Sequence, residues 1–93
     1  MALQQGMDTG KVRGSAGVIK KKASEIEAKG SEAQKVAGQL KQDWLGPDSD
    51  QFQSEWNKAK KKIDLVASEL QKFAKEATTQ ADAQDKRSEN DNG

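Results

Sequence analysis

Residues 44–48 read Trp-Leu-Gly-Pro-Asp, and this stretch decides the fold of the 93-residue chain. Pro47 is the only proline; it has no amide hydrogen to donate, and it disfavours helical geometry at the residue before it. Gly46 can adopt the left-handed conformation that closes a helix. Asp48, with Gln51 three residues later, fits a variant of the capping box that begins a helix. One helix is therefore predicted to end at this point and a second to begin.

Before the bend, apolar and small residues repeat every seven positions in two columns. The first column consists of Val12, Ile19, Ile26, Ala33 and Leu40. The second column, four residues further on, consists of Ala16, Ala23, Gly30, Ala37 and Trp44. The alternating spacing of four and three places both columns on one stripe of an α-helix. A helix is predicted over about 9–44, and the small residues of the second column would let another helix approach closely.

A second pair of columns follows the bend. One consists of Phe52, Ala59, Val66 and Phe73, and the other consists of Trp56, Ile63, Leu70 and Ala77. They predict a helix over about 50–81, joined to the first by a bend at 45–49. Residues 82–93 are polar and charged and predict a disordered tail, so that residues 1–81 form the helical domain.

A connection this short makes the two helices antiparallel neighbours. The predicted fold is therefore all-α, an antiparallel two-helix hairpin with a Trp-X-Gly bend. Other apolar residues lie off the main stripe and widen the apolar face; they are Val18, Val36, Leu65, Ala67 and Ala74. Two hairpins pairing into a four-helix-bundle dimer would bury this face. The predicted seam of the hairpin and the dimer consists of Val12, Ile19, Ile26, Leu40, Phe52, Trp56, Ile63, Val66, Leu70 and Phe73.

The composition argues against catalysis and metal binding. The chain has no cysteine and no histidine, so it lacks the nucleophilic thiol and the commonest metal ligand. Glu25 and Glu27 point to different sides of a helix, and Asp48 and Asp50 fit a helix N-terminus. The sequence therefore predicts no enzymatic activity, no cofactor and no metal site.

The net charge and the hydropathy of the chain restrict which partners and which cellular location are expected. The formal net charge is +1, which gives no general attraction to nucleic acid. No apolar run approaches the roughly 20 residues of a transmembrane helix. Residues 1–22 lack the apolar segment of a secretory signal peptide, so any export is expected to use another route.

Lysines are densest at positions 20–22 and 58–62. In a hairpin folded at 46–48, the first run is predicted to lie near Lys72 and Lys75. One interpretation is a basic patch for an anionic membrane or for nucleic acid. The other, which we favour, is a solvated helix face, since no aromatic residues alternate with the lysines. The carboxylates near these lysines are Glu25, Asp64, Glu69 and Glu76.

The bend motif Trp44-Leu45-Gly46 also has two interpretations. In the first, Trp44 is the last core residue of its helix and Gly46 is the residue that closes it. In the second, the bend is in addition a surface on which a partner helix docks.

With this motif the chain resembles the WXG100 family, the early-secreted-antigen-like substrates of type VII (ESX) secretion systems. The resemblance covers about residues 8–80 and rests on the bend at 44–48, on Phe52 and Trp56, and on a heptad helix on each side. It implies a helical hairpin that dimerises with itself or with a second WXG100 protein. It also implies export from the cytoplasm as a folded dimer by the ATPase of the system, to the cell surface or beyond, and a role as an effector or chaperone-like partner in a family associated with virulence.

One departure concerns the export signal. Many members of the family, or their partners, carry Tyr-x-x-x-Asp/Glu after the second helix, but this chain has no tyrosine. Phe73 is followed four residues later by Ala77 and not by an acid. Either a partner supplies the signal or this chain is recognised differently. Two other functions stay open: a membrane- or envelope-binding helical effector that uses the lysine patches, and an unrelated helical adaptor.

Overall fold

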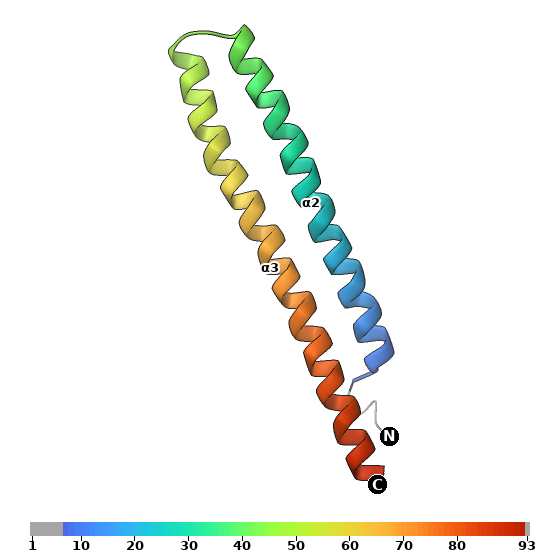
Figure 1. Ribbon diagram of the computed structural model, residues 1–93. Coiled ribbons are helices and arrows are strands. Elements are labelled where there is room, and N and C mark those ends of the chain that lie inside the picture. Colours follow the sequence, from blue (N-terminus) through green and yellow to red (C-terminus); the bar gives the residue numbers. More distant parts are fainter. Residues whose placement is uncertain (1–6, 93) are drawn as a thin grey trace. The chain divides into compact units, whose positions relative to one another are not determined.

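The computed structural model describes residues 7–92, with side chains described for residues 7–87. Over this range the chain forms two helices, α2 (Thr9–Asp43) and α3 (Pro47–Asn92), and no strand (Figure 1). The predicted all-α fold is confirmed. The pairing of two hairpins into a four-helix bundle stays a prediction.

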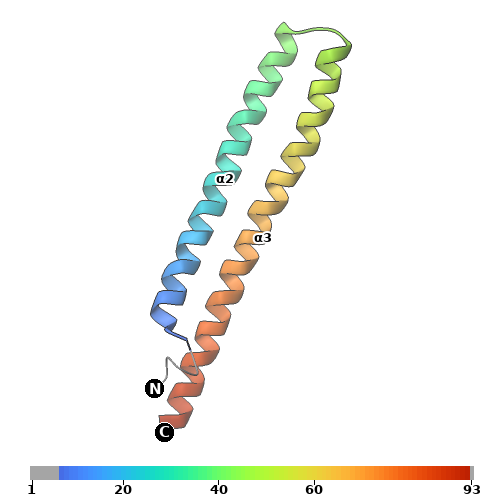
Figure 2. The ribbon, with the colours of Figure 1, turned by 180° about the vertical axis from the view of Figure 1, so that it is seen from behind.

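The two helices contribute to two compact units. The bend unit consists of residues 23–68, and the end unit consists of residues 1–22 and 69–93. In each unit a segment of α2 lies beside a segment of α3 and runs in the opposite direction (Figures 1 and 2). Both units therefore have the antiparallel packing that the short connection predicts.

The start of α2 agrees with the predicted position and is capped by Asp8. The Asp8 Oδ1 accepts a hydrogen bond from the Lys11 amide at 3.1 Å, and its carbonyl accepts one from the Val12 amide at 2.9 Å. Gly14 and Gly17 follow, where an added Cβ would meet nothing within 4 Å. Each costs about 1 kcal/mol relative to alanine in a helix. No neighbouring atom requires a glycine at either position. The two glycines therefore lower the helix propensity of this segment without improving its packing.

The bend has the geometry that the proline and glycine predict. The Trp44 amide donates to the Leu40 carbonyl at 2.9 Å, which completes the last turn of α2. Gly46 has φ of +121°, a conformation that residues with a Cβ rarely adopt. Pro47 is the first residue of α3, where its missing amide hydrogen costs nothing. The Asp50 amide donates to the Gly46 carbonyl at 3.2 Å, so α3 begins slightly earlier than predicted.

In the bend unit, small residues of α2 pack against longer residues of α3. Gly30 and Ala37 are buried. A Cβ added at Gly30 would lie 3.2 Å from Ile63 Cγ2 and 3.4 Å from Lys60 Cε. Further along, Gln53 Nε2 donates to the Ala37 carbonyl at 2.9 Å. The longer side chains of α3 thus fill the space that the small residues of α2 leave.

In the end unit, small residues face small residues. Ala16 of α2 is buried, and so are Ala74 and Ala81 of α3. Ala74 was predicted to lie off the seam, as was Ala67 of the bend unit, but Ala67 has no exposed surface and Ala74 is only 4% exposed. The burial of the two alanines has a physical cause. Two helices approach most closely where side chains are smallest, so the alanines lie between the helices and larger residues flank them.

α3 continues beyond its predicted end near residue 81 and is helical to Asn92. The structure therefore differs from the predicted disordered tail at 82–93, of which residue 93 lies outside the described residues. The first turn of this segment is held to α2 by two ion pairs. Arg13 Nη2 donates to Asp82 Oδ1 at 2.8 Å and to Asp85 Oδ2 at 2.6 Å. Asp82 and Asp85 thus have a partner on α2, which the polar composition of the segment does not reveal.

Candidate interaction surface

The residues of the predicted seam differ in exposure within the single chain. Seven are half-buried: Val12, Ile19, Ile26, Phe52, Trp56, Ile63 and Leu70. Three are exposed, with Leu40 at 38%, Val66 at 49% and Phe73 at 61%. The exposed three are therefore not enclosed by the described residues of their own chain.

Helical geometry separates the two flanks of α2 in the end unit. Successive residues of an α-helix are about 100° apart. Val12 and Ile19 therefore flank the buried Ala16 on one side, and Arg13 and Lys20 flank it on the other.

The flanks of α3 divide in the same way. Leu70 and Ala77 lie on one side of the buried Ala74, and Gln71 and Thr78 lie on the other. The polar flanks of both helices line a common hollow, so they lie on the same side of the helix pair. We call this the polar side of the end unit, and the opposite side, where the apolar flanks lie together, the apolar side. Phe73, next to Ala74, belongs to the apolar side.

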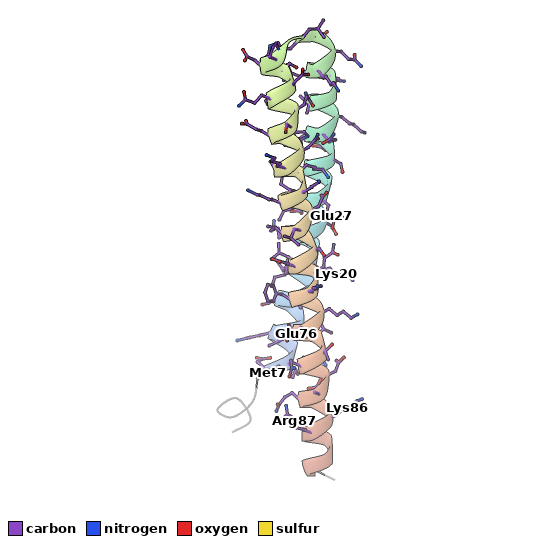
Figure 3. All side chains as sticks on the ribbon, turned by 90° about the vertical axis from the view of Figure 1, so that its left-hand side faces the viewer. Met7, Lys20, Glu27, Glu76, Lys86 and Arg87 are labelled. Atoms are coloured by element: carbon purple, nitrogen blue, oxygen red, sulfur yellow. The ribbon has the colours of Figure 1, made fainter. Side chains whose placement is uncertain are left out.

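The hollow on the polar side has a volume of about 710 Å³. Ala16, Gly17 and Ala74 form its apolar part, and Lys20, labelled in Figure 3, lies at its edge. The other residues that line it are Arg13, Gln71, Lys75, Thr78 and Thr79. Lys20 and Lys75 thus line one hollow, which bears out the predicted proximity for this pair. For the rest of the run and for Lys72 the proximity stays a prediction.

Electrostatics at the end unit centre on Arg13. Its hydrogen bonds with Asp82 and Asp85 raise the pKa of the guanidinium. The hydrogen bond from Arg13, followed by one from Thr9, lowers the pKa of Asp85. All three charged side chains keep substantial exposure, so the pairs fix the register of the two helix ends more than they stabilise the fold.

The bend presents aromatic surface. Trp44 lies just after the end of α2 and is 38% exposed, so it is less enclosed than a last core residue would be. Its ring lies 5.8 Å from that of Phe52 at an interplanar angle of 45°. Leu45 is 84% exposed. Gly46 sets the direction of the chain at this point, and the motif forms a surface of the bend unit and not part of its interior.

A comparison with models of protein families identifies the family of this chain. A family model described as "WXG100: Proteins of 100 residues with WXG" matches residues 5–86, which include both helices of the hairpin and the bend. The chain belongs to the WXG100 family. Comparisons with curated proteins and with solved structures find no match.

Membership of the WXG100 family indicates the general function of the chain. WXG100 proteins are small helical proteins secreted by type VII systems, and the family is not known for enzymatic activity. The family also suggests partnership with other WXG100 proteins. The resemblance predicted from the Trp-X-Gly bend is confirmed.

Among residues 7–92 no helix combines the length and apolar character needed to cross a bilayer. Over the same residues no group of three or more acidic side chains is placed to hold a metal ion.

Sequence reasoning missed the contact of Arg13 with Asp82 and Asp85. A signal for it existed: reflecting Arg13 through a bend at Gly46 gives a position near Thr79, within about one turn of Asp82. The contact was missed because the segment after residue 81 was interpreted as disordered. The buried alanine column of α3 was missed because larger apolar residues dominated the heptad pattern.

Proposed function

We propose that this chain is a small secreted substrate of a type VII (ESX) secretion system that acts by helix pairing and not by catalysis. It pairs with a second copy or with a second WXG100 protein, as an effector or as the chaperone-like half of a pair. The observation that supports this is the apolar surface that one chain leaves exposed. Leu40, Val66 and Phe73 belong to the predicted seam, yet they remain at the surface.

The arrangement of this exposed surface supports pairing with a partner helix. Phe73 adds an exposed aromatic ring to the apolar side, beside the half-buried Leu70, Ala77, Val12 and Ile19. Exposed apolar residues gathered on one side of a molecule mark an interaction surface. A four-helix bundle built from two hairpins would cover this side and leave the polar side in water.

We further propose that the folded pair is exported from the cytoplasm by the ATPase of the secretion system. The chain has no tyrosine, so the usual aromatic-plus-acid export signal has to come from the partner or be replaced by another feature of this chain. The exposed bend with Trp44 and Leu45 and the last turns of α3 are the features available for recognition.

The test compares two substitutions at neighbouring positions. Phe73→Glu places a charge in the apolar side, and Lys72→Glu changes an exposed neighbour on another face of α3. Sedimentation of each purified variant, alone and with any WXG100 protein encoded nearby, reports pairing. Comparison of culture supernatant with cell pellet reports export. Phe73→Glu is expected to abolish both, while Lys72→Glu leaves both unchanged; a paired and exported Phe73→Glu variant would falsify the proposal.

A second candidate function is binding to a membrane or cell envelope. The observation in its favour is a face of α3 on which Lys58, Lys61 and Lys62 are exposed around Leu65, which is 58% exposed. Their spacing places these side chains on one face of the helix. Binding of the purified protein to phosphatidylglycerol vesicles, lost in the triple Lys→Gln variant, would favour this function over helix pairing.

A further inference from the structure

The hollow in the end unit lies on the polar side, opposite the residues proposed to pair with another chain. We propose that this hollow binds a single-chain amphiphilic anion, which is an alkyl chain that carries a carboxylate, sulfate or phosphate head. The site is independent of the proposed function, because helix pairing through the apolar side leaves it open.

The apolar part of the hollow arises from small residues facing each other. Ala16 and Gly17 of α2 and Ala74 of α3 line it together. Ala16 and Ala74 are buried, whereas Gly17 is exposed and a Cβ added there would touch nothing within 4 Å. In the bend unit, by contrast, Ile63 and Lys60 cover the glycine of α2. The hollow has a volume of about 710 Å³ and is a groove open to solvent, because most of the residues that line it are exposed.

The charge at the edge of the hollow is positive. Arg13, Lys20 and Lys75 line it, and none of the residues lining it carries a carboxylate. Arg13 is already engaged by Asp82 and Asp85, so the two lysines, one from each helix, supply the charge for a ligand. A lysine ammonium is a compact charge without the fixed fork of arginine, so carboxylate, sulfate and phosphate heads suit it alike.

The threonines of the hollow restrict the ligand further. Thr78 Oγ1 donates to the Ala74 carbonyl at 3.0 Å, and Thr79 Oγ1 donates to the Lys75 carbonyl at 2.9 Å. Because both hydroxyl protons are used within α3, neither is a donor for a ligand. The threonines thus add no donor for an anionic head, and selection rests on the positive charge of the lysines and on the apolar residues.

The lysines and the apolar residues of the hollow together predict the position of the bound ligand. The anionic head lies between Lys20 and Lys75, and the alkyl chain covers Ala16, Gly17 and Ala74. Binding removes the chain from water, which is favourable by about 0.8 kcal/mol for each buried methylene. A lipid in a bilayer gains nothing from this step because its chains are already out of water. The site therefore suits a free amphiphile in water and not a membrane surface.

The test is an NMR titration of the ¹⁵N-labelled full chain with dodecyl phosphate below its micelle concentration. Saturable shifts are expected at the amides of Ala16, Gly17, Ala74 and Thr78. Inorganic phosphate and the uncharged dodecyl maltoside are expected to leave these amides unshifted. Shifts confined to Val12, Ile19 and Phe73 would overturn the proposal, since the amphiphile would then occupy the apolar side.

Two glycines of α2 provide a matched pair of variants. Gly17→Leu fills the hollow, whereas Gly14→Leu adds the same side chain at a position that does not line it. Neither added Cβ meets a neighbour, and both changes favour the helix, so both variants are expected to fold. Displacing about two methylenes of the ligand predicts roughly tenfold weaker binding to Gly17→Leu and unchanged binding to Gly14→Leu. Equal affinities in the two variants would overturn the site.

Charge is tested with variants of equal net charge. The pair Lys20→Gln and Lys75→Gln removes both ammonium groups of the hollow, and the pair Lys21→Gln and Lys72→Gln removes two lysines outside it. Only the first pair is expected to weaken binding, and equal weakening would indicate general attraction of anions to the surface. Binding to phosphatidylglycerol vesicles with no response to the monomeric amphiphile would also overturn the proposal. Sedimentation separates these outcomes from the proposed function, since all four variants are expected to pair normally.

Discussion

Two glycines of α2, Gly30 in the bend unit and Gly17 in the end unit, have opposite surroundings. At Gly30 an added Cβ would lie 3.2 Å from Ile63, while at Gly17 it would meet nothing within 4 Å. The first glycine lets a large residue of α3 pack against the backbone, and the second leaves space. The same residue type thus contributes to close packing in one unit and to a hollow in the other. Its position on α2 makes the difference, because Gly30 belongs to the buried column of Ala16 and Ala37, whereas Gly17 is one residue beyond that column and is exposed.

The largest expected effect comes from removing the residue that covers Gly30. Ile63→Ala is expected to destabilise the fold by about 2 kcal/mol, near the low end for such changes because Ile63 is only half-buried. Urea unfolding at fixed protein concentration measures it. Lys61→Ala, at an exposed position two residues before, is the control and should stay within about 0.5 kcal/mol. Equal losses in the two variants would show that the bend unit does not depend on this contact.

A smaller effect is expected from enlarging Gly30 itself. Gly30→Leu forces Ile63 and Lys60 apart, and overpacking of this kind costs roughly 1–3 kcal/mol. The gain in helix propensity, about 1 kcal/mol, offsets part of this cost. The same change at Gly17 meets open space and is expected to stabilise the fold. Thermal unfolding of the two variants should therefore give shifts of opposite sign, and shifts of the same sign would contradict the comparison.

A substitution at Gly14 of the end unit is expected to raise the free energy of unfolding by a still smaller amount. Gly14→Ala adds a methyl group that meets nothing, so the variant gains about 0.5–1 kcal/mol from the unfolded chain and from helix propensity alone. Hydrogen exchange at the amides of residues 9–16 measures this stabilisation locally. The exchange is expected to be slower in the variant. Unchanged exchange there, with a raised melting temperature, would mean that this segment does not open by itself.

The bend and the helix type followed directly from local chemistry. Pro47 lacks an amide hydrogen and Gly46 tolerates a positive φ, and both effects operate within a few residues. The heptad columns predicted the faces of each helix because periodicity is also a local property. These features needed no knowledge of which residue lies opposite which.

The features that were missed depend on contacts across the pair of helices. Ala67 and Ala74 resemble any exposed alanine until the register of the two helices places them between the backbones. Arg13 and Asp85 are far apart in sequence, and only the antiparallel register brings them together. The hollow has the same origin, because no single helix reveals that Gly17 and Ala74 line one hollow. Whether Phe73 and Val66 are buried by another chain depends on a contact outside this chain altogether.

The smallest expected effect concerns the Arg13 contacts, and its pH dependence has a definite sign. In the folded chain the pKa of Asp85 is below its ordinary value of about 3.8, because Arg13 and then Thr9 donate hydrogen bonds to the carboxylate. A lowered carboxyl pKa contributes stability that is present above the ordinary pKa and is lost as pH falls through the folded value. Arg13, whose pKa is raised, stays charged throughout.

The register of the helix ends should therefore be constant from pH 7 to about 5 and loosen only in stronger acid. The ¹³C shift of the Asp85 carboxyl, followed against pH, should titrate below the ordinary range, and Arg13→Gln should move its midpoint upwards. Lys11→Gln removes the same charge nearby without removing a partner of Asp85 and should leave the midpoint in place. A midpoint that is the same in all three proteins would show that the carboxylate is not held by Arg13 in solution. The first turn of α3 after Ala81 would then be joined to α2 without the help of Arg13, and the register of the helix ends would not depend on the charge of Asp85.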